Sequence, residues 1–466
     1  MTATWALVRG HFAGSARVAA AAALLALLAL VAAYAVGSGL AWRSAVESEQ
    51  ALQTAKVESD RVDWFTWLEK HEAGEAIPGF RARPMGLPTL AQLPPGPLAE
   101  LAFRREALFP SSALLTGFSN EALLFRRYEL AGPATLAHGA IDLTFVAVVL
   151  MPLVVLLLGH NALSAERDSG RLALLLAQGA RTRRLVAIRV LAGALPAWLI
   201  VATAAAVAAA LGDHPARWSS LAEWLLVVTV YWMFWVALTA LLAAVCHRSV
   251  TAALAAAGVW VALVVVLPSL AQFTAAALHP PPSRVALLSE ARTAEGAAQR
   301  DVERRVEAFM AEHSGEVPLG DNDAPGFHRS GFLANLAVST EVRQVLQAFE
   351  DSRSARERVL RWVQLASPAL LAHQALGAAA GAGPARAASF QRQVREHLGL
   401  IRASIGPAVV GGARLSSEAA RAIPPFRFVE VSTGARGVGA ALYLAILTLL
   451  AALAFTRRVE VATAGR

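Results

Sequence analysis

The chain has 466 residues, of which 56% are hydrophobic and only 16% carry a formal charge. So little charge excludes an ordinary soluble protein, which would then expose a large apolar surface, and it indicates a membrane protein. The single cysteine, Cys246, excludes an intrachain disulfide, so any domain outside the bilayer must be held together by packing.

The apolar residues gather in blocks of about 20 residues, which is the helix length that crosses the ~30 Å hydrocarbon core of a bilayer. The six predicted spans are 18–42, 139–159, 190–211, 221–245, 250–273 and 437–456. The first block is too long for a signal peptide and no convincing cleavage site follows it, so we interpret it as a retained helix.

The net charge of +8 could suggest a nucleic-acid partner, but its placement indicates membrane topology instead. With the N-terminus inside, the predicted cytoplasmic pieces, chiefly 1–17, 160–189 and 457–466, carry twelve arginines and three acidic residues, a net of +9. This asymmetry is what the positive-inside rule expects. The sequence therefore predicts cytoplasmic N- and C-termini, two large extracytoplasmic segments, and no nucleic-acid binding. Few lysines beside many Arg and Ala residues are typical of a GC-rich bacterial genome, so we expect the bacterial inner membrane.

Residues 1–17 are predicted to form a cytoplasmic interfacial helix, because Trp5, Val8 and Phe12 fall on one face; a disordered tail is the alternative. In the first extracytoplasmic segment, 43–138, the stretch Ala45–His71 has helical spacing and should continue the first span outward. A proline-rich connector follows it and cannot be regular helix.

The second extracytoplasmic segment, 274–436, has a mainly helical pattern. We predict helices at Ser289–His313, Thr340–Leu365 and Ser389–Ile405. The apolar run Ser367–Ala380 is short and rich in glycine, which favours a re-entrant or packed helix over a seventh crossing. The predicted fold class is an all-α integral membrane protein with six transmembrane helices and a mainly helical extracytoplasmic domain built from two insertions.

Few residues suggest chemistry within this chain. Asp142 and Glu223 lie near the outer ends of predicted spans, where a structural role is favoured over a proton path. The lysines Lys56 and Lys70 are not part of a Gly-Lys-Ser/Thr phosphate loop, so no Walker A motif is present. Asp321, Asp323 and His328 fit a turn better than a cation site. We therefore predict no catalytic, cofactor or metal site.

The loop 160–189 between the second and third spans is the most informative stretch. Polar, acidic residues are followed by Gly170, a leucine-rich turn and a basic cluster. Leu172, Leu175 and Leu176 fall on one helical face. We expect this face to be exposed and therefore to need a partner, which could equally be lipid headgroups or a protein groove.

This loop resembles that of ABC-2 type transporter permeases, the membrane subunits of ATP-binding cassette exporters. The residues that match the family pattern are Glu166, Arg167, Asp168, Gly170, Leu172, Leu175 and Leu176. Arg171 stands where Thr is common and Gly179 where Pro is common. The resemblance implies that these seven residues belong to a coupling helix seated in a groove of an ABC ATPase, and that ATP and magnesium are bound by that ATPase pair. It also implies a second permease copy or a related permease, in a homo- or heterodimer.

A second resemblance is to the ABC-2 branch with large external insertions after the first and fifth spans. It is carried by four stretches of the external segments: His279–Arg284, Ser367–Leu371, Ala380–Gly383 and Ile423–Phe428. Together the resemblances imply a permease subunit that exports an unidentified substrate with energy from a separate ATPase, and no enzymatic activity of its own. The alternative is a membrane-anchored extracytoplasmic binding or sensory protein without transport activity.

Overall fold

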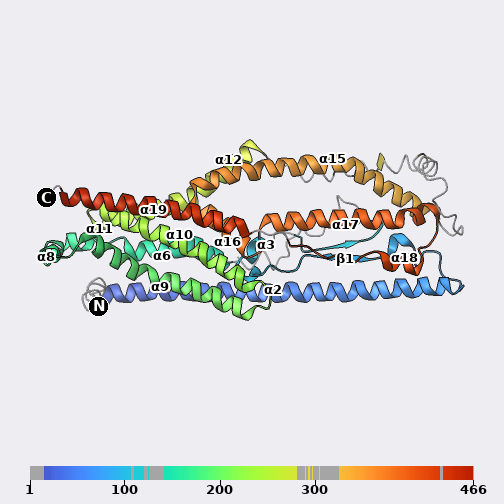
Figure 1. Cartoon of the computed structure of the whole chain (residues 1–466), viewed down its shortest axis with the longest axis horizontal. Coiled ribbons are helices and arrows are strands. Elements are labelled where there is room, and N and C mark those ends of the chain that lie inside the picture. Colours follow the sequence, from blue (N-terminus) through green and yellow to red (C-terminus); the bar gives the residue numbers. More distant parts are fainter. Residues whose placement is uncertain are drawn as a thin grey trace.

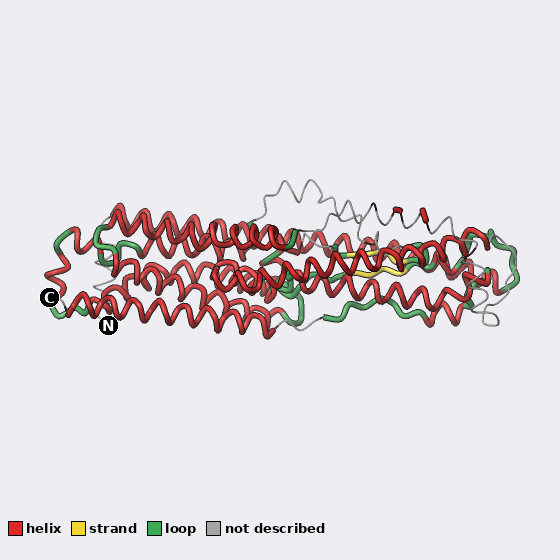
Figure 2. The backbone as a smooth tube through the Cα atoms, turned by 90° about the horizontal axis from the view of Figure 1, so that it is seen from above, coloured by secondary structure: helices red, strands yellow, loops and turns green. Residues whose placement is uncertain are grey.

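The computed structural model describes residues 15–106, 110–119, 124, 141–280, 289, 292–293, 296–297, 304, 325–430 and 434–464. The molecule is elongated, and its long helices run lengthwise (Figures 1 and 2). The start of α2 (Ser15–Glu72), the short helix α8 (Arg171–Ala177) and the last turns of α19 (Gly434–Ala464) lie at one end, which we call the loop end. The far end of α2 and helix α18 (Ser417–Ala422) lie at the opposite end, which we call the insertion end.

Six helices of the described chain are long and apolar enough to cross a membrane, as predicted. Their bounds are Val18–Glu72, Leu143–Asp168, Thr182–Leu211, Arg217–Val245, Ser249–Leu278 and Gly437–Val459. Span 1 is part of α2, span 3 is α9 (Thr182–Leu211), span 4 is α10 (Arg217–Val245), and span 6 is part of α19. Span 2 joins α5 (Leu143–Phe145), η4 (Val146–Leu150), α6 (Met151–Gly159) and α7 (Ser164–Asp168), whereas span 5 joins α11 (Ser249–Trp260), η5 (Val261–Val266) and α12 (Leu267–Leu278).

Spans 2, 3, 5 and 6 pack around α10. Its aromatic residues Trp224, Tyr231 and Trp235 are fully buried, and α9 and α19 lie against it. On α9 the buried face consists largely of alanines, among them Ala197 and Ala205. Small side chains let helix backbones approach closely in a bilayer, where apolar burial alone gives little driving force.

Helix α2 runs unbroken for 58 residues, which confirms that Ala45–His71 continues the first span. Beyond the membrane its apolar residues Trp64 and Leu68 are buried in the core of the insertions. The same core contains Met85 and Leu115 of the first insertion and Phe390 of the second. The two insertions therefore share one hydrophobic core and form a single domain.

The proline-rich connector holds a small sheet that the sequence analysis did not predict. Strands β1 (Thr89–Gln92) and β2 (Ser112–Leu115) pair antiparallel, with Thr89 opposite Leu115. Four-residue strands are too short to show a clear alternation in the sequence. Between them lie η2 (Ala99–Leu101) and α3 (Phe103–Glu106), and η1 (Pro84–Gly86) precedes them, so the domain remains mainly helical.

The second insertion contains α15 (Pro325–Val363), η6 (Gln364–Ala366), α16 (Pro368–Ala379) and α17 (Pro384–Gly411). Helix α15 starts well before the predicted 340–365 and ends at Val363, with η6 covering the last two residues of that prediction, whereas α17 includes the predicted 389–405 and is longer at both ends. The apolar run 367–380 forms α16, which packs against α10 and α19. With twelve residues it is a packed helix and too short for a seventh crossing. The predictions for residues 1–14, most of 289–313, and Asp321 and Asp323 fall outside the described residues.

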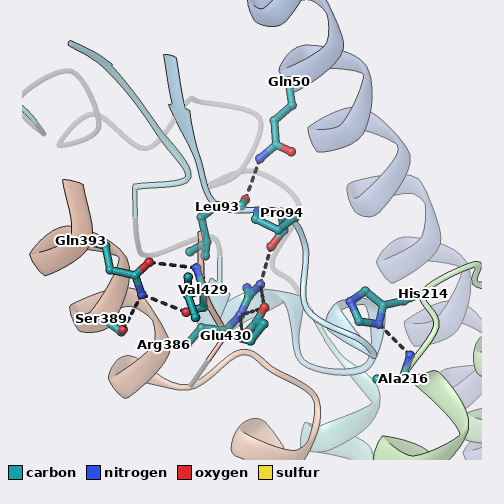
Figure 3. Close-up of polar contacts among 10 residues, drawn as sticks. All are labelled: Gln50, Leu93, Pro94, His214, Ala216, Arg386, Ser389, Gln393, Val429 and Glu430. Atoms are coloured by element: carbon teal, nitrogen blue, oxygen red, sulfur yellow. Dashed lines mark hydrogen bonds and ion pairs between the residues drawn. The ribbon is translucent and has the colours of Figure 1, made fainter. Parts of the chain in front are cut away.

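Polar contacts hold the start of α17 to the first insertion and to the segment that precedes span 6 (Figure 3). On α17, the Arg386 guanidinium pairs with Glu430 and donates to the Pro94 carbonyl at 2.8 Å. The amide of Gln393 both donates to and accepts from the backbone of Val429, each at 2.9 Å. These contacts fasten the chain that leads from the insertion core into span 6.

The carboxylates near the outer ends of spans have structural roles, as favoured above. Asp142 is buried and caps α5, because its Oδ1 accepts the Phe145 backbone N–H at 2.8 Å. Glu223 accepts a hydrogen bond from the Gly437 backbone and so ties span 4 to span 6. The Asp142 cap satisfies one of the free N–H groups at the start of α5.

Candidate coupling loop

The loop between spans 2 and 3 consists of α7 and α8 joined by a sharp bend at Gly170. Gly170 has φ +70°, in the left-handed region that favours glycine. Gly179, with φ +82°, ends α8, and its N–H donates to the Leu176 carbonyl while Ala180 donates to Leu175. This pair of bonds is a Schellman motif. Glycine therefore closes the helix at the position where the family commonly has proline.

Glu166 lies at the centre of the loop and is 5% exposed. Its carboxylate pairs with Arg189 of α9 at 3.1 Å and with Arg171 of α8 at 3.1 Å. Arg189 is itself buried and also donates to the Ala162 carbonyl at 3.1 Å. One buried carboxylate thus joins α7, α8 and the start of span 3. Removing one member of such a pair leaves an uncompensated buried charge.

The other two charged residues of the motif connect α7 to the turn between spans 4 and 5. Arg167 donates to the Cys246 carbonyl at 3.0 Å. The Asp168 carboxylate accepts from the Ser249 backbone N–H at 3.1 Å and from its hydroxyl at 2.6 Å. Because Ser249 is the first residue of α11, the carboxylate also lies at the positive end of that helix.

The expectation of an exposed leucine face on α8 is wrong for Leu172. That side chain is only 8% exposed and packs with Leu163, Leu185 and Val186 in an apolar cluster at the loop end. Leu175 and Leu176 are partly buried against the same cluster. The face predicted to need a partner therefore finds one within its own chain, because the start of span 3 and the ends of spans 4 and 6 lie beneath it.

The opposite face of α8 is open. Leu174 is 62% exposed, and Ala173, Ala177 and Gln178 are exposed beside it. Helix α8, which lies at the loop end of the molecule (Figure 1), therefore has an inner face anchored by Leu172 and an outer face that exposes Leu174. Among the residues that the structure describes, no group of three or more His, Cys, Asp and Glu side chains could hold a metal ion.

Comparison with protein families agrees with this arrangement. The family model described as "ABC-2 family transporter protein" matches residues 12–459, nearly the whole chain. The chain belongs to the ABC-2 transporter family. No curated protein matches the chain in a sequence comparison. The permease is thus a multi-pass membrane component of a transporter, and it is not itself catalytic.

Within this permease the structure brings Glu166, Arg167 and Asp168 onto one short helix and directs each to a different partner. Two arginines that the sequence analysis did not assign to the site complete it. Arg171 pairs with Glu166, although it stands where Thr is common in the family. Arg189 was assigned to the loop, and its position directly before the apolar block of span 3 was the only signal that it could be buried.

Proposed function

We propose that this permease is the membrane subunit of an ATP-driven exporter in the bacterial inner membrane, and that α8 is its docking helix for an ABC ATPase. The loop end faces the cytoplasm in this proposal, and the insertion domain lies outside. The permease acts in a pair with a second copy or a related permease. The ATPase binds ATP and magnesium, and the permease recognises the substrate.

The observation that carries the proposal is the division of α8 into two faces. The inner face is fixed by Leu172, and the start of the helix is fixed by the Arg171–Glu166 pair. The outer face exposes Leu174 at the loop end. An exposed apolar side chain on a helix whose base is immobilised is suited to a complementary groove. The sequence lacks a phosphate-binding loop, so the nucleotide site has to be on a partner.

The contacts of the loop suggest how movement of an ATPase reaches the spans. Helix α7 continues span 2, the Glu166–Arg189 pair joins the loop to span 3, and Asp168 joins it to the start of span 5. A displacement of α8 is therefore passed to three spans at once. ATP shifts the permease between two states only if the ATPase contacts differ between them.

The placement of charge supports the orientation. Arg181, Arg183 and Arg184 follow α8, and Arg457 and Arg458 lie near the end of α19 at the same end of the molecule. Such a cluster beside span ends is typical of the cytoplasmic side.

The proposal is tested by replacing Leu174 with Asp in the full-length permease. We expect the variant to insert and melt as the wild type does, because the side chain is exposed. In affinity purification from membranes, the wild type should retain a Walker-motif ATPase and its ATP hydrolysis. The variant should lose most of both, because docking would desolvate a carboxylate against an apolar groove, at a cost of several kcal/mol.

Leu52→Asp is the matched control, because Leu52 is also highly exposed, at 73%, but lies on α2 beyond the membrane. It should retain the ATPase in full. If Leu174→Asp also retains it in full, α8 is not the docking helix. If the wild type retains no ATPase under any condition, a membrane-anchored binding protein becomes the better function.

A further inference from the structure

Two spans of the described chain contain a π-helical segment with a proline two residues after its end. Span 2 has Val146–Leu150 with Pro152, and span 5 has Val261–Val266 with Pro268. In each segment the backbone bonds run from residue i to i−5, as from Met151 to Val146. A π segment widens the helix and often marks a functional site or a kink.

The proline in span 2 leaves a carbonyl without its usual donor. Pro152 has no N–H, so the Val148 carbonyl four residues earlier receives no α-helical bond from it. The Tyr231 hydroxyl of span 4, which is fully buried, donates to this carbonyl at 2.9 Å. The indole of Trp260 in span 5 donates to the next carbonyl, that of Val149, at 3.1 Å. Span 4 thus satisfies the carbonyl that Pro152 leaves without an α-helical donor, and span 5 adds a second side-chain donor at the next carbonyl.

The segment Val148–Pro152 of span 2 lies between a part fixed to the insertion domain and a part that ends in the coupling loop. On the insertion side, Asp142 caps α5, and the Thr144 hydroxyl donates to the Leu101 carbonyl of the first insertion at 2.9 Å. On the loop side, α6 leads into α7 through a single turn. A displacement of the loop relative to the insertion domain must therefore be taken up at or near Val148–Pro152.

Span 5 repeats the arrangement and is tied to the same helix. Its first residue, Ser249, donates to Asp168 of α7 at 2.6 Å. In its π segment the Leu263 carbonyl accepts from the Ser367 hydroxyl at 3.3 Å. Both spans with π segments are thus connected to α7. Span 2 continues into it, and the first residue of span 5 is held by the Asp168 carboxylate of α7.

We propose that Val148–Pro152 is the hinge at which span 2 bends when the coupling loop moves, and that Tyr231 and Trp260 are positioning residues that hold the hinge in the conformation seen here. The inference rests on the proposed function, because there the ATPase drives the movement of the coupling loop. The hinge itself is a property of the permease alone. It opens when the side-chain donors leave the carbonyls of Val148 and Val149, and α6 then moves with α7 while α5 stays with the insertion domain.

The hinge is tested by hydrogen exchange on the purified full-length permease in nanodiscs. Tyr231→Phe removes only the hydroxyl, and we expect the amides of 149–156 to exchange roughly three- to tenfold faster, the factor that corresponds to one net hydrogen bond. Trp260→Phe should act in the same direction. Matched controls are Thr239→Val, whose hydroxyl donates within its own helix, and Trp232→Phe, whose indole donates to Ala194 of α9. Neither control should change exchange in 149–156.

A double-mutant cycle separates the hinge from general loosening of the core. Pro152→Ala supplies the N–H that Val148 lacks, so the Tyr231 hydroxyl becomes redundant there. We expect Tyr231→Phe to accelerate exchange with Pro152 present and to have no effect in Pro152→Ala. An equal effect in both backgrounds, or equal acceleration by the controls, overturns the proposal. If Tyr231→Phe does not fold, Trp260→Phe is compared with Trp232→Phe instead: faster exchange of 149–156 in Trp260→Phe alone supports the hinge, and no difference between the two overturns it.

The role of bending in transport is tested with the ATPase bound. Pro152→Ala should retain the ATPase as the wild type does but lower permease-stimulated ATP hydrolysis several-fold, because a straightened span 2 resists movement. Full stimulation in Pro152→Ala contradicts the hinge. Loss of ATPase retention in Leu174→Asp tests only docking, so failure of the proposed function and failure of the hinge are distinguishable.

Discussion

The two ends of the permease are held together in different ways. At the loop end, a few buried or short polar contacts, centred on Glu166, Arg189 and Asp168, join α7 to several spans. At the insertion end, a broad apolar core with Trp64, Met85 and Phe390 is shared by two distant parts of the chain. Polar contacts depend steeply on distance and angle, so they transmit small displacements. A close-packed core keeps its shape. The comparison suggests that the loop end is built to pass on movement and the insertion end to remain one body.

The largest effect is expected at Glu166. Glu166→Ala leaves Arg189 charged and buried without its partner, and loss of one member of a buried pair costs about 3–5 kcal/mol. We expect a lower melting temperature and loss of ATPase retention together. Asp168→Asn is the comparison, because Asp168 is exposed and the amide oxygen of the new side chain can still accept from Ser249, so the melting temperature should change far less. Equal destabilisation by both substitutions would contradict the account of the loop end.

The insertion domain should be most sensitive where backbones meet. Gly381 has φ +79°, and a Cβ there would lie 2.5 Å from Pro97 Cδ and 2.9 Å from Gly96 Cα. Gly381→Ala should therefore destabilise the insertion domain by about 1–3 kcal/mol, by strain and overpacking. Gly399→Ala on α17 meets nothing within 4 Å and should be neutral or stabilising by up to ~1 kcal/mol. Thermal melts of the two variants check this pair, and a harmless Gly381→Ala would show that the domain is not tightly joined there.

A smaller effect is expected from acid. Burial lowers the pKa of His397 on α17 below its ordinary value of 6.5. Its ring packs edge-on against Phe426 in the insertion domain. The unfolded chain then binds the proton more readily, so the stability present above the ordinary pKa is lost progressively as the pH falls below it. His397→Leu should lose less stability between pH 7 and pH 5 than the wild type, as measured by melting temperature. An identical pH dependence would exclude His397 as the source.

The sequence predicted the extent of the long helices better than it predicted which helix faces are exposed. Unbroken helical spacing across span 1 and Ala45–His71 predicted α2, because one periodic pattern continues through both. The short strands β1 and β2 were missed because four residues give almost no periodic signal. The face of α8 was assigned correctly as apolar but wrongly as exposed. Helical periodicity shows which residues share a face and does not show what covers it, so Leu172 and Arg189 needed the tertiary structure.

The most direct test of the central claim is cysteine accessibility on the two faces of α8, in a permease whose Cys246 is replaced by Ala. In inside-out membrane vesicles, a cysteine at Leu174 should react rapidly with an impermeant maleimide, and added ATPase should protect it. A cysteine at Leu172 should react slowly with or without ATPase, and one at Ser59 on α2 should react only from the outside of intact cells. The account predicts this pattern. Labelling at Leu174 from outside intact cells, or labelling that purified ATPase leaves unchanged, would contradict it.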